Sequence, residues 1–490
     1  MASTTAPVRE GEYGERVIAI EPGGIEFIPE SERHGKPFKL FWTWNSPNWE
    51  FATVFVGAVV FLLGGGFWLS AVAVLVGTGL GCLSHFLLSS MGPRYGVPQL
   101  VQSRGAFGYV GNFLPAGLNT VFAGIGWFIV NSVSGTFALT SLTELMHRHF
   151  GFPAFAFQLS LVIIVVLQVF VAFIGHNFIH SFERFVFPYL FVVFTISCII
   201  IFAHSNPGIG YNPKATGPMG QSGAFLLGVF ISFGYAIGWN PFASDYSRYL
   251  PATSNRFMVG LWSALGVFIP CVLLEVAGAA SATVVGTNYF GASPTDQFIK
   301  PLPDLLAALT LLGISTGTVS ANVLNIYSAS MSFLALGLKM GGFRLRRAVT
   351  ALGLGVVGLI VAFALQANVG PGSKYETFLL TLGYWITPFL GVVFVDYWLR
   401  HGEYRESVFF DRGRRTWKGA AAMLIGIVCT YFFWNQQPPF QPGSKPGLGA
   451  IPGNWPQLGD LSFIVGFGVA AILYLLFSRI GREAAPAPAR

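Results

Sequence analysis

The 490-residue chain is 53% hydrophobic and only 10% charged, with a formal net charge of +7. Soluble globular proteins carry about 25% charged residues. The composition therefore excludes a soluble globular protein and indicates a protein with many membrane-spanning helices. The positive charge does not indicate nucleic-acid binding, because its placement between the apolar segments explains it.

Twelve apolar segments are long enough to span a bilayer, which takes about 20 residues. They cover residues 45–65, 67–91, 110–143, 155–175, 184–203, 222–243, 257–285, 304–336, 347–367, 375–399, 417–434 and 460–480. The polar segments 1–42 and 481–490 flank them as tails, and the first lacks the apolar core of a signal peptide.

The Lys and Arg residues set the expected orientation. With the N-terminus inside, 23 of the 28 fall on the inner side and five on the outer side. Because inner loops of membrane proteins are enriched in Lys and Arg, the pattern predicts a plasma (inner) membrane protein with both termini in the cytosol.

Polar residues interrupt the first span at its start, where the sequence reads NSPNW over residues 45–49. The sixth span contains a similar interruption, GWNP over residues 238–241. Proline removes an amide donor and clashes with the preceding helical turn, and glycine adds backbone freedom. We therefore expect both helices to be broken.

The two interruptions lie at corresponding places in two sets of five spans, residues 43–203 and 222–400, with two more spans in 417–480. Five spans per set give the sets opposite orientations in the membrane. Interrupted spans in corresponding positions of two such halves are typical of a secondary transporter built from inverted repeats.

Few ionisable residues lie within the spans, and such residues usually mark function. Glu50 falls in the first span and Glu275 in the seventh. Two further pairs have helical spacing near the inner ends of spans six and ten, so we expect each to form an ion pair within its helix: Asp245 with Arg248, and Asp396 with Arg400.

Neutral polar residues share faces on the third and eighth spans. Trp127 and Asn131 are one turn apart on the third span. On the eighth, Asn322 and Asn325 lie on one face, and Thr316 and Ser320 lie on another. Several amides and hydroxyls in one span indicate a lined cavity.

Three segments carry a resemblance to a known family: NSPNWEFATVFVG at 45–57, GWNPFASDYSRYLP at 238–251 and FVDYW at 394–398. Over residues 25–435 the chain resembles the nucleobase–cation symporters, and within them the purine–cytosine permease branch. The resemblance implies an all-α polytopic membrane fold with a five-plus-five inverted repeat (LeuT-type) and two further C-terminal helices. It also implies import of a nucleobase with Na⁺ or H⁺.

The resemblance further implies that seven residues contact a small planar heterocycle: Ser46, Asn48, Trp127, Asn131, Trp239, Asn322 and Asn325. Two tryptophans would sandwich the ring, and asparagines would bind its polar edge as donors and acceptors. The chain departs from the family pattern at Asn240 and Leu324. The alternative is therefore another ring, such as allantoin, uracil, a hydantoin or a vitamin-like heterocycle.

For the coupling ion we expect Na⁺ rather than H⁺, and no other metal or cofactor. In this family the ion site lies between the broken first span and the eighth span. Candidate ligands are the hydroxyls of Thr316 and Ser320, with Ser315 as a further one, and main-chain carbonyls near Pro47 and Phe51. The alternative is a proton on Glu275, or on Glu50. Glu50 could instead cap the helix break or line a wet vestibule.

Two other functional classes fit the sequence less well. A membrane enzyme would need a cluster of catalytic side chains, whereas the histidines in and between the spans are scattered: His85, His176, His180 and His204. We expect His176 and His180 to be interfacial loop residues. A channel has little use for two broken helices in antiparallel repeats. We therefore expect a transporter.

Overall fold

The computed structural model describes residues 7–9, 11–290, 293–338, 346–365, 375–436 and 447–480. The predicted tail at 481–490 lies outside these residues. Within them, ten helices are long and apolar enough to cross a membrane. Their cores are α3 (Phe67–Ser89), α8 (Trp127–Phe150), α9 (Phe157–Ile174), α10 (His176–His204), α12 (Gly220–Ile237), α14 (Arg256–Val285), α16 (Asp304–Ala335), α17 (Arg347–Leu365), α18 (Tyr375–Leu399) and α21 (Ser462–Arg479).

Two of the predicted spans contain shorter helices. Span 45–65 contains α2 (Phe51–Leu62), with α1 (Lys39–Asn45) ending where the predicted span begins, and span 417–434 contains α19 (Lys418–Thr430). The total of twelve spans and their inverted repeat stay predictions. The remaining short helices and strands are α4 (Gly92–Tyr95), α5 (Gln99–Gln102), α6 (Arg104–Gly111), α7 (Phe113–Leu118), α11 (Pro213–Thr216), α13 (Ala243–Ser247), α15 (Pro294–Ile299), α20 (Ala450–Asn454), β1 (Asn435–Gln436) and β2 (Gly447–Leu448).

Helix 1 is broken where the sequence predicts it. After α1 the chain makes a 3-10 turn over Ser46–Asn48, and Trp49 (ψ 69°) and Glu50 (φ −147°, ψ 169°) are non-helical. Helix 6 is interrupted more gently, by a 3-10 turn over Asn240–Phe242 between α12 and α13. The interruptions therefore differ: one leaves the helical conformation and the other only tightens it.

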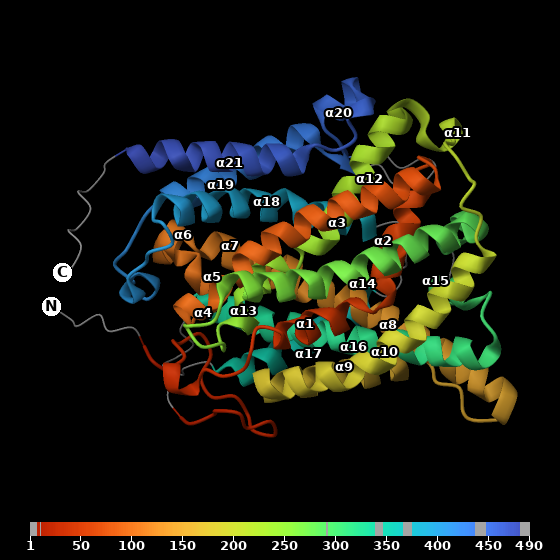
Figure 1. The fold of residues 1–490 in the computed structure, drawn as a ribbon, viewed down its shortest axis with the longest axis horizontal. Coiled ribbons are helices and arrows are strands. Elements are labelled where there is room, and N and C mark those ends of the chain that lie inside the picture. The colour runs from red at the N-terminus through yellow and green to blue at the C-terminus, as the bar shows by residue number, and fades with distance from the viewer. Residues whose placement is uncertain are drawn as a thin grey trace.

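The long helices form two packed groups and a third layer (Figure 1). The first group is α2, α3, α12 and α14, and the second is α8, α9, α16 and α17. The 3-10 turn of helix 1 and helix α10 contact α16, so they lie at the junction of the groups. Helices α18, α19 and α21 pack together along the first group, at the top of Figure 1.

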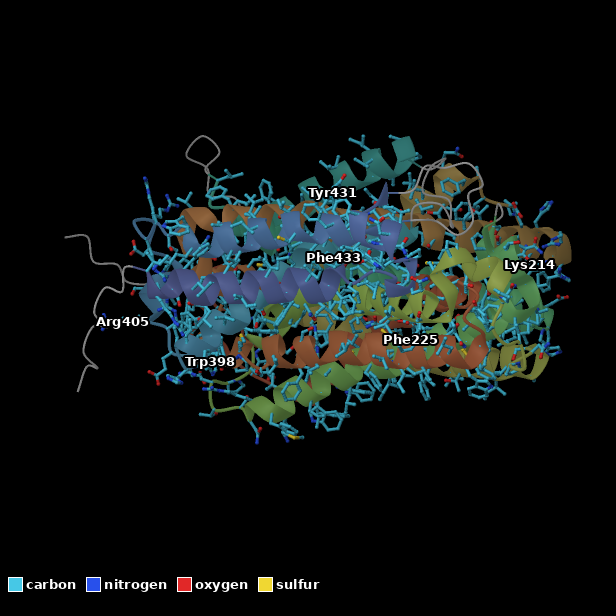
Figure 2. The ribbon with its side chains drawn as sticks, turned by 90° about the horizontal axis from the view of Figure 1, so that it is seen from above. Lys214, Phe225, Trp398, Arg405, Tyr431 and Phe433 are labelled. Carbon is cyan, nitrogen blue, oxygen red and sulfur yellow. The ribbon has the colours of Figure 1, made fainter. Side chains whose placement is uncertain are left out.

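The surface of the long helices is apolar, as a lipid-facing surface should be. Phe185, Leu305 and Ile360 are more than half exposed on α10, α16 and α17. Figure 2 shows Lys214 at one end of the helices and Trp398 at the other.

One prediction about local structure is wrong. His176 and His180 are not loop residues, because α10 begins at His176 and includes both. Gly175, with φ 119°, separates α9 from α10, and the His176 ring stacks on Tyr249 with centroids 3.7 Å apart. The polar residues of this segment hide its helical spacing in the sequence.

Candidate substrate and cation site

A hydrogen bond between side chains joins the two interrupted helices. The Trp239 indole nitrogen donates to Asn48 Oδ1 at 2.9 Å, and the Asn48 amide nitrogen donates to the Trp44 carbonyl at 2.7 Å. Both Asn48 and Trp239 are buried. The Trp239 ring meets the edge of Trp44, with centroids 5.7 Å apart. The interruption in helix 6 is thus fixed against the break in helix 1.

Trp127 lies beside the same interruption, on the other group of helices. A Cβ built on Gly238 would come within 2.7 Å of Trp127 Nε1. The Trp127 ring stands edge-on to Tyr235 and Phe378, at centroid distances of 5.3 and 5.1 Å. The structure therefore brings Trp127 and Trp239 to one place, where each ring packs against other aromatic side chains.

Asparagines tie α8 to α16 at this level. Asn322 Nδ2 donates to the Phe128 carbonyl at 2.9 Å and to Ser132 Oγ at 3.1 Å. Asn322 Oδ1 accepts from Asn325 Nδ2 at 3.0 Å. Among the described residues, the buried oxygens Asn131 Oδ1 and Asn325 Oδ1 have no donor. Because buried polar atoms are normally paired, these two are available to the N–H groups of a ligand.

The hydroxyl groups of the candidate site do not all face the break in helix 1. Ser320 donates to the Glu183 carboxylate, and Ser46 donates to the Glu183 main-chain carbonyl at 2.7 Å. Thr316 instead donates to the carbonyl of Leu312 in its own helix at 2.7 Å. The structure thus gathers Ser46 and Ser320 at the helix break, together with the buried Pro47 and Phe51, but turns the Thr316 hydroxyl away.

Helix α16 lies directly against the break. A Cβ on Gly317 would collide with the Trp49 carbonyl oxygen. Ser315 Oγ donates to Leu311 at 3.0 Å and approaches the Gly135 carbonyl at 3.3 Å, so it ties α16 to α8. The Na⁺ arrangement stays a prediction.

The two carboxyl groups named as proton candidates are both buried. Glu50 caps α2, because its Oε2 accepts from Ala52 N at 3.4 Å, and its Oε1 accepts from the Tyr235 hydroxyl at 3.1 Å. Glu275 lies in α14 and accepts from Thr78 Oγ1 at 3.4 Å. Of the three roles weighed for Glu50, the capping role is therefore observed.

Glu183 is a buried site residue that the sequence reasoning missed, because it assigned this part of the chain to a loop. It lies in α10 with its side chain fully buried. A signal was present: Glu183, Val186, Leu190 and Phe194 follow one another at helical spacing and are all buried. Reading the helix back to His176 would have placed the carboxyl on the inward face.

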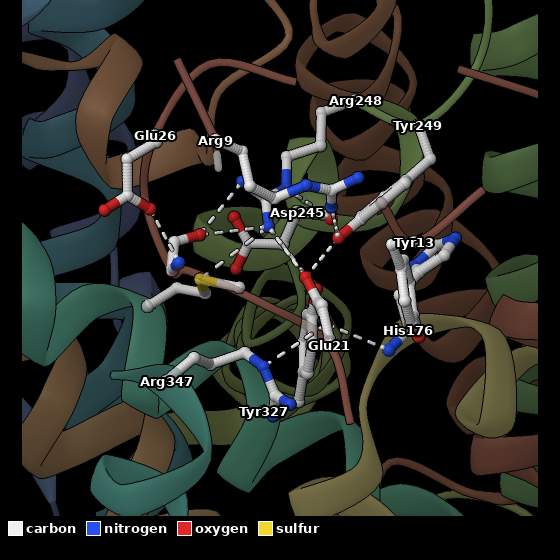
Figure 3. Close-up of polar contacts among 12 residues, drawn as sticks. Arg9, Tyr13, Glu21, Glu26, His176, Asp245, Arg248, Tyr249, Tyr327 and Arg347 are labelled. Atoms are coloured by element: carbon white, nitrogen blue, oxygen red, sulfur yellow. Dashed lines mark hydrogen bonds and ion pairs between the residues drawn. The ribbon is translucent and has the colours of Figure 1, made fainter. Parts of the chain in front are cut away.

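A second polar cluster surrounds Glu21 of the N-terminal segment (Figure 3). Glu21 contacts Arg347 Nε at 3.2 Å and Arg248 Nη2 at 3.5 Å, with all three side chains buried. Its carboxylate also accepts from the Tyr327 hydroxyl and from His176 N, at 3.1 and 3.0 Å. An N-terminal residue thus binds helices that are far apart in the sequence.

This cluster corrects one predicted ion pair. Arg248 pairs with Glu21, and Asp245 Oδ1 instead accepts from Gln99 N at 2.8 Å. The pairing changes because the guanidinium points toward the N-terminal segment. The other predicted pair is confirmed, since Arg400 Nε lies 2.8 Å from Asp396 Oδ1.

Comparison with known families decides the class. Residues 27–466 match the model of a family described as permease for cytosine/purines, uracil, thiamine, allantoin. The chain belongs to this family. The resemblance seen in the sequence is confirmed, and the chain is a permease rather than an enzyme.

Curated relatives are similar to this permease over nearly the whole chain. The putative purine-cytosine permease YxlA of Bacillus subtilis is 27% identical over 472 residues, which cover 94% of this chain and 96% of the relative. The purine-cytosine permease fcyB of Emericella nidulans is 27% identical over 481 residues, covering 94% and 88%.

Solved structures share the permease's fold. Mhp1, a nucleobase-cation-symport-1 family transporter in a closed conformation with bromovinylhydantoin bound, aligns with a TM-score of 0.71 at 18% identity, covering 94% of this chain and 95% of Mhp1. MhsT in complex with L-phenylalanine aligns at 0.53 and 13%, covering 91% and 98%. The expected all-α polytopic membrane fold is confirmed.

Proposed function

We propose that this permease imports a nucleobase of the cytosine or purine type by cation symport and alternating access. One observation carries the proposal: the two interrupted helices meet at the Trp239–Asn48 hydrogen bond, and Trp127 lies beside them at Gly238. Asn131, one turn after Trp127 on α8, and Asn325 on α16 have amide oxygens that are unpaired among the described residues. A planar ring with N–H groups on its edge suits both features, since it stacks on indole and satisfies the oxygens.

In this mechanism the ring enters between Trp127 and Trp239 after the cation has bound. Asn131 and Asn325 accept hydrogen bonds from its N–H groups, and Ser46 and Asn48 reach it once their present partners yield. The two helix groups then rock against each other at their junction, which exposes the ring to the cytosol. Both termini face the cytosol of a plasma (inner) membrane protein, as the distribution of Lys and Arg favours.

The identity of the coupling cation is a separate part of the proposal. Ser320 and the broken backbone near Pro47 and Phe51 offer oxygen ligands for Na⁺, with Thr316 as the further ligand expected from the sequence. A proton is the alternative. Relatives named purine-cytosine permeases favour a nucleobase, whereas the bromovinylhydantoin bound to Mhp1 is the observation that favours another heterocycle as the second candidate.

Uptake into proteoliposomes tests the proposal. Labelled cytosine, adenine, hypoxanthine, uracil and allantoin are offered to vesicles containing the purified permease, under an inward Na⁺ or H⁺ gradient. We expect saturable uptake of at least one base that unlabelled base inhibits. Empty liposomes give the background. No uptake of any of the five under either gradient contradicts the proposal.

A further inference from the structure

We propose that the Glu183 carboxyl group binds the proton that drives this symport. The inference rests on the proposed function and names its coupling ion and the residue that carries it. It differs from the Na⁺ expected from the sequence, and it selects neither Glu50 nor Glu275. The observations that lead to it are the position, partners and charge environment of Glu183.

Glu183 lies where a coupling group must lie, between moving parts. Its carboxylate accepts a hydrogen bond from Ser320 of α16, and its main-chain carbonyl accepts one from Ser46 in the break of helix 1. A cation bound here therefore acts on α10, α16 and helix 1 together. Glu275 faces helices of a single group, through Thr78 of α3. Glu50 lies beside Gly317 of α16 through its Cβ, but its carboxylate bonds to Tyr235 of α12 and not to α16.

The carboxyl has a vacant oxygen. Glu183 is fully buried, and Oε1 has no hydrogen-bond partner among the described residues. No Lys or Arg in the described part of the chain forms an ion pair with it, in contrast to Glu21 with its two arginines. An ionised carboxylate buried without a counter-charge is costly, so the group is stable here when a proton neutralises it.

Titratable groups surround Glu183 on several sides. On α10, His180 lies one turn before it and the exposed Arg184 follows it. Helix α1 places Lys39 near His180, and Tyr246 of α13 interacts electrostatically with Glu183.

The other neighbours add little charge. Helix α16 has no charged residue after Asp304, and α9 has none. Glu50 starts α2, with its carboxylate directed to Tyr235. Lys39 and Arg184 are exposed, so solvent screens them. Glu183 is thus the acidic group that lies against both serines.

A cavity one helical turn from Glu183 is the proposed route for proton release. His176, His180 and Tyr246 line a cavity that also touches Leu40 of α1. Glu183 follows His180 by one helical turn, so the cavity approaches the carboxyl from the N-terminal end of α10. In the proposed step a hydronium ion of the outside water gives its proton to the Glu183 carboxylate: one O–H bond of the ion breaks, the carboxyl O–H bond forms, and a water molecule is left. After the helices rock, that bond breaks and the proton passes to water in the cavity.

The tight contact at Gly317 favours a proton over Na⁺. Helix α16 touches the Trp49 carbonyl so closely that a Cβ on Gly317 has no room. An ion with several oxygen ligands would have to separate these backbones, whereas a proton needs no added volume. The Thr316 hydroxyl also stays on its own helix.

The experiment compares wild-type permease with Glu183→Gln, which mimics the protonated side chain. In proteoliposomes with an imposed pH gradient, we expect wild type to accumulate the base up to about tenfold per pH unit for one proton per substrate. Glu183→Gln should not accumulate it, yet should still exchange labelled for unlabelled base without a gradient. Exchange shows that the variant is folded and binds substrate.

Binding measurements give a second, independent result. The affinity of wild type for the base should fall as pH rises, by at most about tenfold per pH unit, because proton and substrate binding are linked. The affinity of Glu183→Gln should not change with pH. Exposed Glu144, at the far end of α8, supplies the matched control: Glu144→Gln should keep both behaviours of wild type.

Three outcomes overturn the proposal. Acid-driven accumulation by Glu183→Gln would exclude Glu183 as the proton carrier. Loss of accumulation with retained exchange in Glu50→Gln or Glu275→Gln, but not in Glu183→Gln, would assign the proton elsewhere. Accumulation by wild type under a Na⁺ gradient but not a pH gradient would make the ion Na⁺ while leaving the proposed function intact. If no base is transported at all, the proposed function itself fails.

Discussion

Trp239 has two separate roles, one of its ring and one of its N–H group. The ring offers a stacking surface, and the N–H group holds Asn48 of helix 1 at 2.9 Å. Trp239→Ala removes both. Because stacking of a base on an aromatic side chain contributes about 1–3 kcal/mol, we expect the dissociation constant for the transported base to rise about tenfold or more.

Binding titration of the purified permease measures this change. Trp398→Ala is the matched control, because Trp398 is 66% exposed at one end of the molecule. It should bind the base as wild type does. Unchanged affinity in Trp239→Ala would contradict stacking at this position.

The buried amide oxygen of Asn131, like that of Asn325, has no partner among the described residues. Asn131→Leu keeps the size of the side chain but removes that acceptor. Little thermal stability should be lost, since no hydrogen bond to the oxygen is broken, whereas base affinity should fall about tenfold, as expected for one hydrogen bond to a ligand.

The same two measurements, melting temperature and affinity, separate this effect from misfolding. Asn454→Leu, at an exposed position in α20, should change neither affinity nor transport. A large loss of stability with unchanged affinity would assign Asn131 to structure rather than to binding.

At the scale of elements, the close contact of α16 with helix 1 depends on Gly317, because glycine has no side chain. Gly317→Ala places a methyl group against the Trp49 carbonyl, so α16 must move away from the break. Overpacking of this kind costs about 1–3 kcal/mol. We expect a lower melting temperature and a strong loss of transport rate.

The matched control is Gly353→Ala in α17, where a Cβ would meet nothing within 4 Å. That variant should be as active as wild type and no less stable, because alanine favours the helix. Equal effects of the two substitutions would show that the Gly317 contact has no special part in transport.

Elements with a strong local signal could be predicted from sequence. The break in helix 1 follows from Pro47 and its polar neighbours, and the apolar runs located the long helices. How far the backbone of helix 6 departs from the helical conformation could not be predicted, because Gly238 and Pro241 are compatible with both a 3-10 turn and a full break. The partner of Arg248 is a tertiary contact with residue 21, which no local pattern encodes.

At the scale of the whole molecule, Glu21 links the N-terminal segment to α10, α16 and α17 and to Arg248 at the end of helix 6. Burial alone raises the pKa of Glu21, but Arg347 and Arg248 more than offset this and hold the pKa below its ordinary value. A depressed pKa stabilises the folded protein above the unfolded pKa of about 4.3. That contribution is lost as pH falls through the folded pKa.

Glu21→Gln should therefore lower the melting temperature at neutral pH, because it leaves two buried arginines without their shared acid. Removing one partner of a buried pair costs about 3–5 kcal/mol. The variant should also lose part of the decline in stability that wild type shows below about pH 4.3. Glu12→Gln, on an exposed side chain of the same segment, is the control. If the melting temperatures of wild type and Glu21→Gln changed with pH by the same amount, this assignment would be contradicted.

Helix α14 holds both halves of broken helix 1. Gly266 admits the backbone of α1 at Phe41, and Gly278 admits the backbone of α2 at Val54. Asn45 Nδ2 adds a hydrogen bond to the Gly266 carbonyl at 3.2 Å. Because α1 and α2 both pack closely on α14, the break between them is not a free hinge. We expect helix 1 and α14 to move together as one rigid unit. The contact that opens during transport is then on the opposite side of helix 1, where Ser46 and Ser320 bond to Glu183.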